Sequence, residues 1–200
     1  VVALKQAVAR NLLKKTKIMH ANLPGFLRLK REVDNRLSIM FENESQMSAE
    51  TTTGNAGRSE ALSLLIIDEA AFIKNARELW SSIQATLSAS EGDAVVLSTP
   101  SNIGTWFHET WSNAVSGADL VDSTENKEIW SGVGENDFHP IKLHWSLHPD
   151  RDAAWRREQD NKLPASKAAR EYDTSFESSG DTVIGMERIR SIEKSQVTNP

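Results

Sequence analysis

The stretch Leu64-Leu65-Ile66-Ile67-Asp68-Glu69 sets two carboxylates directly after four apolar residues. An apolar run without alternation is typical of a strand that is covered on both faces, as in a parallel sheet between helices. Residues 94–97, Ala-Val-Val-Leu, repeat this pattern. Between the two runs, Leu79, Ile83 and Leu87 recur at the spacing of a helix. The order strand, helix, strand predicts a βαβ unit and therefore an α/β fold with a mostly parallel sheet.

Further elements are predicted on both sides of this unit. Upstream, we expect an amphipathic helix over residues 2–17, a half-buried strand at 37–41, a turn at 42–45, and an edge strand followed by a loop within 46–57. Downstream, we expect a short helix around 107–115, a long surface excursion over 116–139, a strand at 141–145, a polar helix at 150–162 and a last helix after Pro164 that Ser166 caps.

Composition excludes several classes of protein. The chain has 200 residues, of which 38% are hydrophobic and 26% are charged, so it fits one globular domain or a piece of a larger one. No apolar run exceeds four residues, far short of the roughly 20 that span a bilayer, which excludes a membrane-spanning helix. Cysteine is absent, which excludes a disulfide scaffold, a zinc–thiolate site and a cysteine nucleophile.

Charge is distributed unevenly along the chain. Residues 1–36 carry nine Lys or Arg against two acids, a net charge of +7, so the other 164 residues sum to −12. A basic segment of this kind attracts nucleic acid by releasing counterions from phosphates. The solvated face of an amphipathic helix is the alternative interpretation.

The two predicted buried strands both end in polar residues. A parallel sheet brings the carboxyl ends of its strands to one edge, where open α/β folds bind ligands. There Asp68 would hold Mg²⁺ on a nucleotide, through water, and Glu69 would aim the water that attacks the γ-phosphate, which is the Walker B arrangement. Ser98 and Thr99, which follow the second strand, would reach the same phosphates. A chance Asp-Glu pair and an ordinary turn at 98–102 are the structural alternatives.

Together these segments resemble the ATPase domain of the large subunit of tailed-phage terminases, the motors that package viral DNA. The resemblance is carried by residues 55–59 (Asn-Ala-Gly-Arg-Ser), 64–73, 80–83, 95–100 and 104–111, and near the end by 170–172 with Phe176, Ser179-Gly180 and Val183-Ile184. It implies a RecA-like fold of the ASCE P-loop NTPase type, with helices flanking the sheet, ATP as substrate and Mg²⁺ as cofactor. Asp68 would be the Mg²⁺-associated acid, Glu69 the catalytic residue, and Ser98, Thr99 and Pro100 the coupling motif. Arg58 would be an arginine finger that reaches a neighbouring subunit's nucleotide.

One part of the family's pattern is missing. A phosphate-binding loop ends in Gly-Lys followed by Ser or Thr, and none of the ten glycines here precedes a lysine. We therefore expect an internal piece that is incomplete at its N-terminus and inactive alone. Residues 1–170 would form a partial ATPase domain, and 171–200 its end and the linker toward a nuclease.

The resemblance also implies partners and a location. The complete protein would drive double-stranded DNA into a procapsid as a ring on the portal protein, with a small terminase subunit, in the cytoplasm of the infected bacterium and without a membrane. A helicase-like P-loop ATPase and a non-catalytic remnant that binds DNA or a partner stay open as alternatives. His139, His144 and His148 fall within ten residues, but their spacing completes no metal motif.

Overall fold

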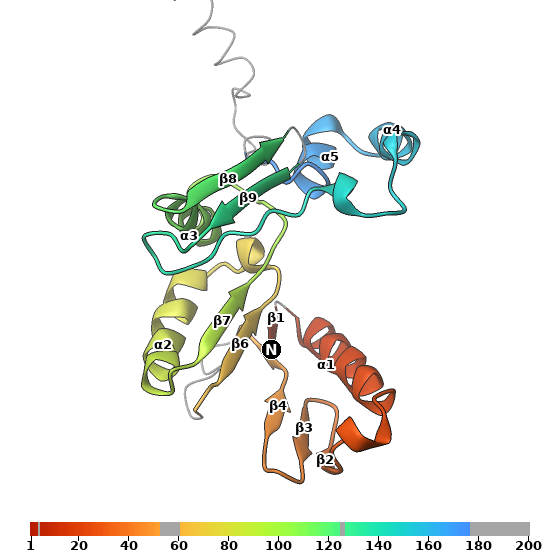
Figure 1. The fold of residues 1–200 in the computed structure, drawn as a ribbon, viewed down its shortest axis with the longest axis vertical. Coiled ribbons are helices and arrows are strands. Elements are labelled where there is room, and N and C mark those ends of the chain that lie inside the picture. Colours follow the sequence, from red (N-terminus) through yellow and green to blue (C-terminus); the bar gives the residue numbers. More distant parts are fainter. Residues whose placement is uncertain (4, 53–60, 125–126, 177–200) are drawn as a thin grey trace, which may run out of the picture. The chain divides into compact units, whose positions relative to one another are not determined.

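The structure, a computed structural model, describes residues 1–3, 5–52, 61–124 and 127–176 (Figure 1). The chain divides into two compact units, Val1–Ser98 and Thr99–Pro200, and each is described by itself. Within the described ranges, no helix combines the length and the hydrophobicity needed to cross a membrane.

The first unit is built on a four-stranded parallel sheet with the order β5-β1-β6-β7. Its strands are β1 (Val2–Ala3), β5 (Glu50–Thr51), β6 (Leu64–Ile67) and β7 (Asp93–Val96). The α/β prediction is confirmed. The expectation that the first helix includes residues 2 and 3 was wrong, because these residues are a strand inside the sheet. Val2 pairs with both Glu50 and Ile67, and it is only 3% exposed.

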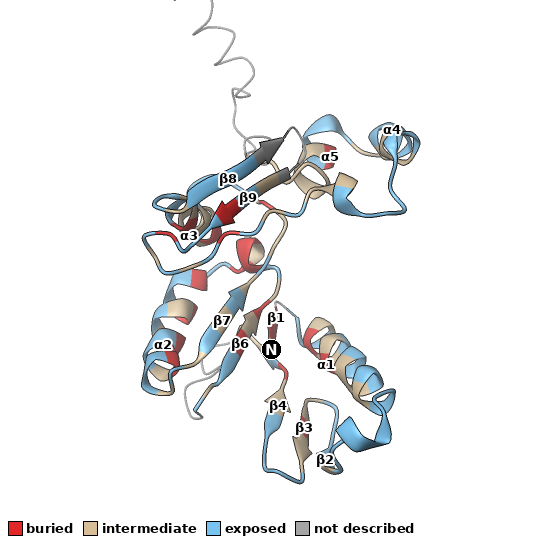
Figure 2. Cartoon of the chain, in the orientation of Figure 1, coloured by how far each residue is buried: buried red, intermediate tan, exposed pale blue. Residues whose placement is uncertain are grey.

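Two helices accompany this sheet. Helix α1 (Gln6–Ala21) buries Ala9 and Leu13 in a cluster with Ala3, Ile39 and Ala49. Helix α2 (Ala76–Ala89) joins β6 to β7 and buries a face at the predicted spacing: Leu79, Ile83 and Leu87. The βαβ unit is therefore confirmed, and Figure 2 shows the buried stripe on α2.

Burial of the two strands differs from the prediction. Leu65 and Ile67 of β6 are buried, but Leu64 is 52% exposed, and Val95 of β7 is 48% exposed. The prediction that both strands are covered on both faces was thus wrong. Among the described strands, β7 pairs only with β6, so it forms an edge of the sheet, where burial is incomplete.

A small antiparallel sheet follows α1 in the chain. It consists of β2 (Arg31–Asp34), β3 (Ser38–Phe41) and β4 (Gln46–Ser48), with β3 in the middle. Ile39 of β3 is fully buried and the other residues of the strand are half-buried, so the strand is half-buried as predicted, although burial does not alternate along it. The predicted strand, turn and return strand are confirmed.

In the part of the second unit that the structure describes, the α-helices are α3 (Trp106–Val115), α4 (Ala153–Lys162) and α5 (Ala165–Glu171), and the strands are β8 (Asp119–Thr124) and β9 (Lys127–Ser131). The predicted helices near 107–115 and 150–162 are confirmed. The segment 116–139 is largely exposed where its burial is described, as predicted, but it holds the antiparallel pair β8–β9, which the sequence did not predict. The ring of Trp130 on β9 is buried edge-on against Trp111 of α3, at 5.4 Å between centroids, which explains why this polar segment folds back.

Two smaller expectations in this unit were wrong. Ile141 makes a single bridge to Ile129, residues 142–144 belong to no helix or strand, and Trp145 begins a short 3-10 helix, Trp145–Leu147. Helix α5 begins at Ala165 directly after Pro164, and no side chain caps it. Ser166 is therefore the second residue of the helix and not the cap; Pro164 occupies the cap position, and its side chain has no oxygen to accept a backbone N–H.

Candidate active site at the ends of β6 and β7

The carboxyl ends of β6 and β7 lie side by side. The two strands run parallel in a register that pairs Ile67 with Val96, and Leu97 N–H continues the ladder by donating to Ile67 O at 3.0 Å. Asp68 and Ser98 each follow one of these ends in the chain. The structure thus brings these two predicted site residues to one edge of the sheet, as the parallel arrangement requires.

Asp68 is anchored through its backbone. Its N–H donates to Val2 O of β1 at 3.0 Å, and its side chain is half-buried. Oδ1 accepts the N–H of Glu69 at 3.0 Å, which holds the carboxylate against the turn that follows. One oxygen of the Asp68 carboxylate is therefore hydrogen-bonded to the local backbone.

Glu69 adopts the left-handed conformation, with φ 56° and ψ 39°. This region is unfavourable for a residue with a Cβ, by about 1–2 kcal/mol. Glu44, Glu91, Asp137 and Thr174 share a positive φ, so the conformation alone does not mark a site. What sets Glu69 apart is its place, because its exposed side chain follows Asp68 at the end of a central strand.

The residues after Glu69 are tied to the end of β7. Ala70 N–H donates to Leu97 O at 3.2 Å, and Ala71 N–H donates to Ser98 Oγ at 3.2 Å. Both alanines are buried at the start of the 3-10 helix Ala70–Phe72, where a larger side chain would have little room. Ser98 thus has a definite partner that the sequence did not reveal: its hydroxyl oxygen accepts a backbone N–H of the carboxylate loop, residues 68–71.

The remaining predicted site residues are Thr99, Pro100 and Arg58, and the structure does not place them at this edge. Thr99 and Pro100 begin the second unit, in which Thr99 is half-buried and Pro100 is buried, and their role stays a prediction. Arg58 lies outside the described residues, as do residues 55–57, 59 and 177–200 of the predicted pattern.

The three histidines make separate contacts. His144 Nδ1 lies 2.8 Å from Ser146 Oγ, while His148 Nδ1 accepts the N–H of Asp150 at 3.2 Å. His139 Nδ1 lies against the carbonyl of Gly132. Over the described ranges, no three His, Asp or Glu side chains are grouped as they would be around a metal ion.

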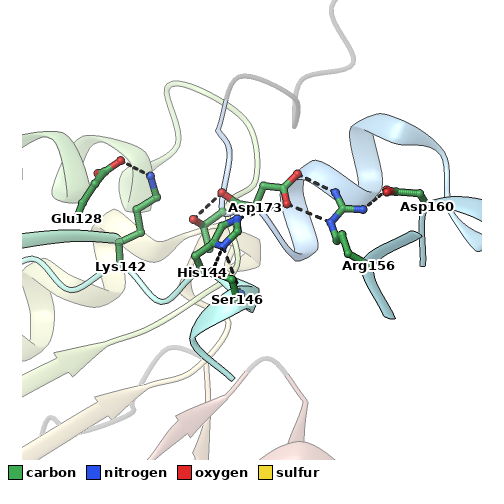
Figure 3. A network of polar contacts seen from close by, with 8 residues as sticks. Glu128, Lys142, His144, Ser146, Arg156, Asp160 and Asp173 are labelled. Atoms are coloured by element: carbon green, nitrogen blue, oxygen red, sulfur yellow. Dashed lines mark hydrogen bonds and ion pairs between the residues drawn. The ribbon is translucent and has the colours of Figure 1, made fainter. Parts of the chain in front are cut away.

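A polar network in the second unit was not predicted (Figure 3). The carboxylate of Asp173 accepts hydrogen bonds from Arg156 Nη2 at 2.8 Å and Nε at 3.3 Å, and it lies 3.6 Å from His144 Nε2. Burial lowers the pKa of His144, although the Asp173 carboxylate opposes that shift. The network ties the 3-10 helix Trp145–Leu147 to α4 and to the end of α5, so we interpret it as structural.

Comparison with known proteins finds a matching family and two similar relatives. Residues 5–191 match the protein family described as "Terminase large subunit, T4likevirus-type, N-terminal". The large terminase subunits of Thermus virus P23-45 and Thermus phage G20c are 31% and 30% identical to the chain over 131 residues, which are 64% of this chain. These residues are 25% of either relative, so the chain matches about a quarter of their length.

Solved structures support the fold. The large terminase ATPase domain of Thermus phage P74-26 superimposes with a TM-score of 0.61 at 21% identity, over 88% of this chain and 74% of that chain. A point mutant of the same domain gives a TM-score of 0.60 at 22% identity, over 88% of this chain and 75% of that chain. At this level of identity the likeness supports the α/β fold that the sequence predicts and the RecA-like type that the resemblance implies.

Proposed function

The chain belongs to the family of terminase large subunits of the T4-like virus type, whose N-terminal region it matches, and from this premise we propose that it is part of the ATP-hydrolysing motor that packages double-stranded viral DNA into a procapsid. The observation that carries the proposal is the meeting of the Asp68 and Ser98 chain ends at one sheet edge, joined by the bond from Ala71 N–H to Ser98 Oγ. A nucleoside triphosphate would bind at this edge.

Asp68 has the donor chemistry that Mg²⁺ requires. Magnesium in nucleotide sites takes one or two carboxylates and completes its shell with waters and phosphate oxygens, so a single acid suffices. When bound, the ion would offset the charge of the β- and γ-phosphates. Asp68 would hold it with a carboxylate whose Oδ1 is already fixed by the Glu69 N–H.

Glu69 would act on the attacking water. Its carboxylate would accept a hydrogen bond from that water and orient it toward the γ-phosphate. The left-handed backbone is maintained although it is unfavourable, and such conformations concentrate at functional sites. Ser98, Thr99 and Pro100 would couple hydrolysis to movement, and Arg58 would reach the nucleotide of a neighbouring subunit.

The remaining parts would come from elsewhere in the complete protein. An upstream phosphate-binding loop would bind the triphosphate, and the partners would be double-stranded DNA, the portal protein, a small terminase subunit and further copies in a ring, in the cytoplasm of the infected bacterium. The family match over residues 5–191 favours this function over a helicase-like ATPase. ATP hydrolysis by the complete protein separates it from a non-catalytic remnant.

The test is ATP hydrolysis by the complete protein that carries this chain. We expect Glu69→Gln to lower kcat by at least about a hundredfold, as loss of a general base does, and EDTA to abolish activity. Glu91→Gln is the matched control, because Glu91 is also exposed and has φ 51°, yet it lies after α2. Equal activity in the Glu69 and Glu91 variants would refute the proposed role of Glu69, and a complete protein without ATPase activity would refute the motor.

A further inference from the structure

A pocket of about 370 Å³ lies in the first unit, between the end of α1 and the segment that leads into β2. Figure 1 shows these two segments. It is lined by His20 and Ala21 of α1, by residues 28–31, and by Glu42. The nucleotide site proposed above uses none of these residues.

The wall of the pocket is basic. Arg28, Lys30 and Arg31 line it against the single carboxylate of Glu42, which accepts the backbone N–H of Lys30 at 3.1 Å. Arg28 and Lys30 are exposed. The side chain of Lys30 makes no hydrogen bond or ion pair within the described part of the chain, so its ammonium group is available to an anion.

Arg31 differs from Arg28 and Lys30, because its guanidinium already makes several hydrogen bonds within the protein. It donates to Asp34 Oδ2 at 2.8 Å, to Lys17 O at 2.5 Å and, through Nε, to His20 Nδ1 at 3.1 Å. Since His20 Nδ1 accepts, the neutral ring carries its proton on Nε2. That Nε2 atom is buried and has no partner in the described ranges, and a buried donor without an acceptor is unfavourable. His20 therefore lines the pocket without presenting Nε2 to solvent.

The end of α1 does not oppose a bound anion. The C-terminus of a helix carries partial negative charge on its last carbonyls. In α1, two of these carbonyls accept hydrogen bonds from guanidinium groups: Lys17 O from Arg31, and Ala21 O from Arg28 Nη1 at 3.1 Å. A third, Ile18 O, accepts the backbone and side-chain amides of Asn22. Two guanidinium groups therefore cover the negative end of the helix beside the pocket.

We propose that this pocket binds a phosphate group. Arg28 and Lys30, which line the pocket and are exposed, supply the charged donors. The net charge of +7 over residues 1–36 raises the local concentration of a polyanion. The phosphate is that of a DNA backbone, the source that the proposed function provides, or a free phosphate, and the two sources are separable by experiment.

The experiment compares two double variants that remove the same charge. Arg28→Gln with Lys30→Gln alters the pocket, whereas Lys14→Gln with Lys15→Gln alters exposed lysines of α1 that do not line it. Lys30→Gln alone keeps the contact of Arg28 with α1 and guards against a folding defect. Binding of a short DNA duplex is measured by fluorescence anisotropy over a series of salt concentrations, and binding of inorganic phosphate by calorimetry.

With DNA as the source, we expect the pocket double variant to bind the duplex at least about tenfold more weakly and to lower the salt slope by about 2, one for each contact. The Lys14/Lys15 variant should keep its slope. With free phosphate as the source, the pocket variants should lose phosphate binding and keep duplex binding. Equal effects of the two double variants on both probes would overturn the inference. Glu69→Gln should leave both probes unaffected, so failure here and failure of the proposed ATPase are distinguishable.

Discussion

Replacing Ser98 by alanine tests how the candidate site is held together. The substitution removes the oxygen that accepts Ala71 N–H at 3.2 Å and leaves this donor unpaired on a residue that is only 7% exposed. An unsatisfied buried donor costs about 1–3 kcal/mol. The bond is at the long end of the normal range and Ser98 is half-buried, so water can replace part of it, and we expect a loss of about 1 kcal/mol.

Hydrogen exchange at the Ala71 amide measures this loss locally. A cost of about 1 kcal/mol corresponds to roughly fivefold faster exchange if the amide opens locally. Urea unfolding measures the same change in global stability. Ser98→Thr retains the hydroxyl and should stay within about 0.5 kcal/mol, and so should Ser81→Ala, whose hydroxyl bonds to Arg77 O on an exposed turn of its own helix.

Two results would contradict this reasoning. If exchange at Ala71 is equally slow in Ser98→Ala and in Ser81→Ala, the hydroxyl does not hold the loop. If ATP hydrolysis in the complete protein falls while exchange at Ala71 is unchanged, Ser98 acts by touching the nucleotide and not by positioning the loop.

Three further changes have defined outcomes. Glu69→Gly removes the left-handed penalty, so the protein should gain about 1 kcal/mol of stability in urea while losing ATPase activity; full activity would show that the carboxylate is dispensable. Burial lowers the pKa of His144, so at mildly acidic pH the unfolded chain binds a proton at this residue more readily than the native protein does. The free energy of unfolding should therefore fall as the pH drops from 7 toward 5. An equally steep decline in His144→Gln would disprove this cause. Asp173→Asn weakens the ion pair with Arg156, whose side chain is 15% exposed, and should lower the free energy of unfolding by about 1–3 kcal/mol. Asp160 also pairs with Arg156 but is itself 49% exposed, so Asp160→Asn should cost under about 0.5 kcal/mol. Equal losses in the two variants would refute the distinction.

The sequence predicted the βαβ unit because its signals are local. Four apolar residues on each strand and three at helical spacing between them identify β6, α2 and β7 without knowledge of the rest. Strand β1 carries a similar signal, because residues 1–4 (Val-Val-Ala-Leu) are also four apolar residues, but the prediction assigned them to the helix that follows. The strand is identified by its pairing, since Val2 pairs with Glu50 and Ile67 far along the chain.

Part of the candidate site could likewise be predicted from the sequence, and part could not. Its two chain ends were predictable, since parallel neighbours must end at one edge. The hydrogen bond from Ala71 to Ser98 was not, because it joins residues 27 positions apart through a hydroxyl that also suits an ordinary turn. The pair of Arg156 and Asp173 was missed for a related reason, as ion pairs 17 residues apart leave no periodic trace.

The contacts of the carboxylate loop explain how Glu69 keeps an unfavourable backbone. Before Glu69, the N–H of Asp68 is bonded to β1; after it, the N–H groups of Ala70 and Ala71 are bonded to Leu97 and Ser98. These bonds fix both flanks of Glu69, so its φ is determined by the sheet and not by local preference. Because two of them come from the end of β7, a displacement of that end must move the loop or break the bonds. The position of the Glu69 backbone therefore depends on residues 97 and 98, directly before the chain enters its second unit.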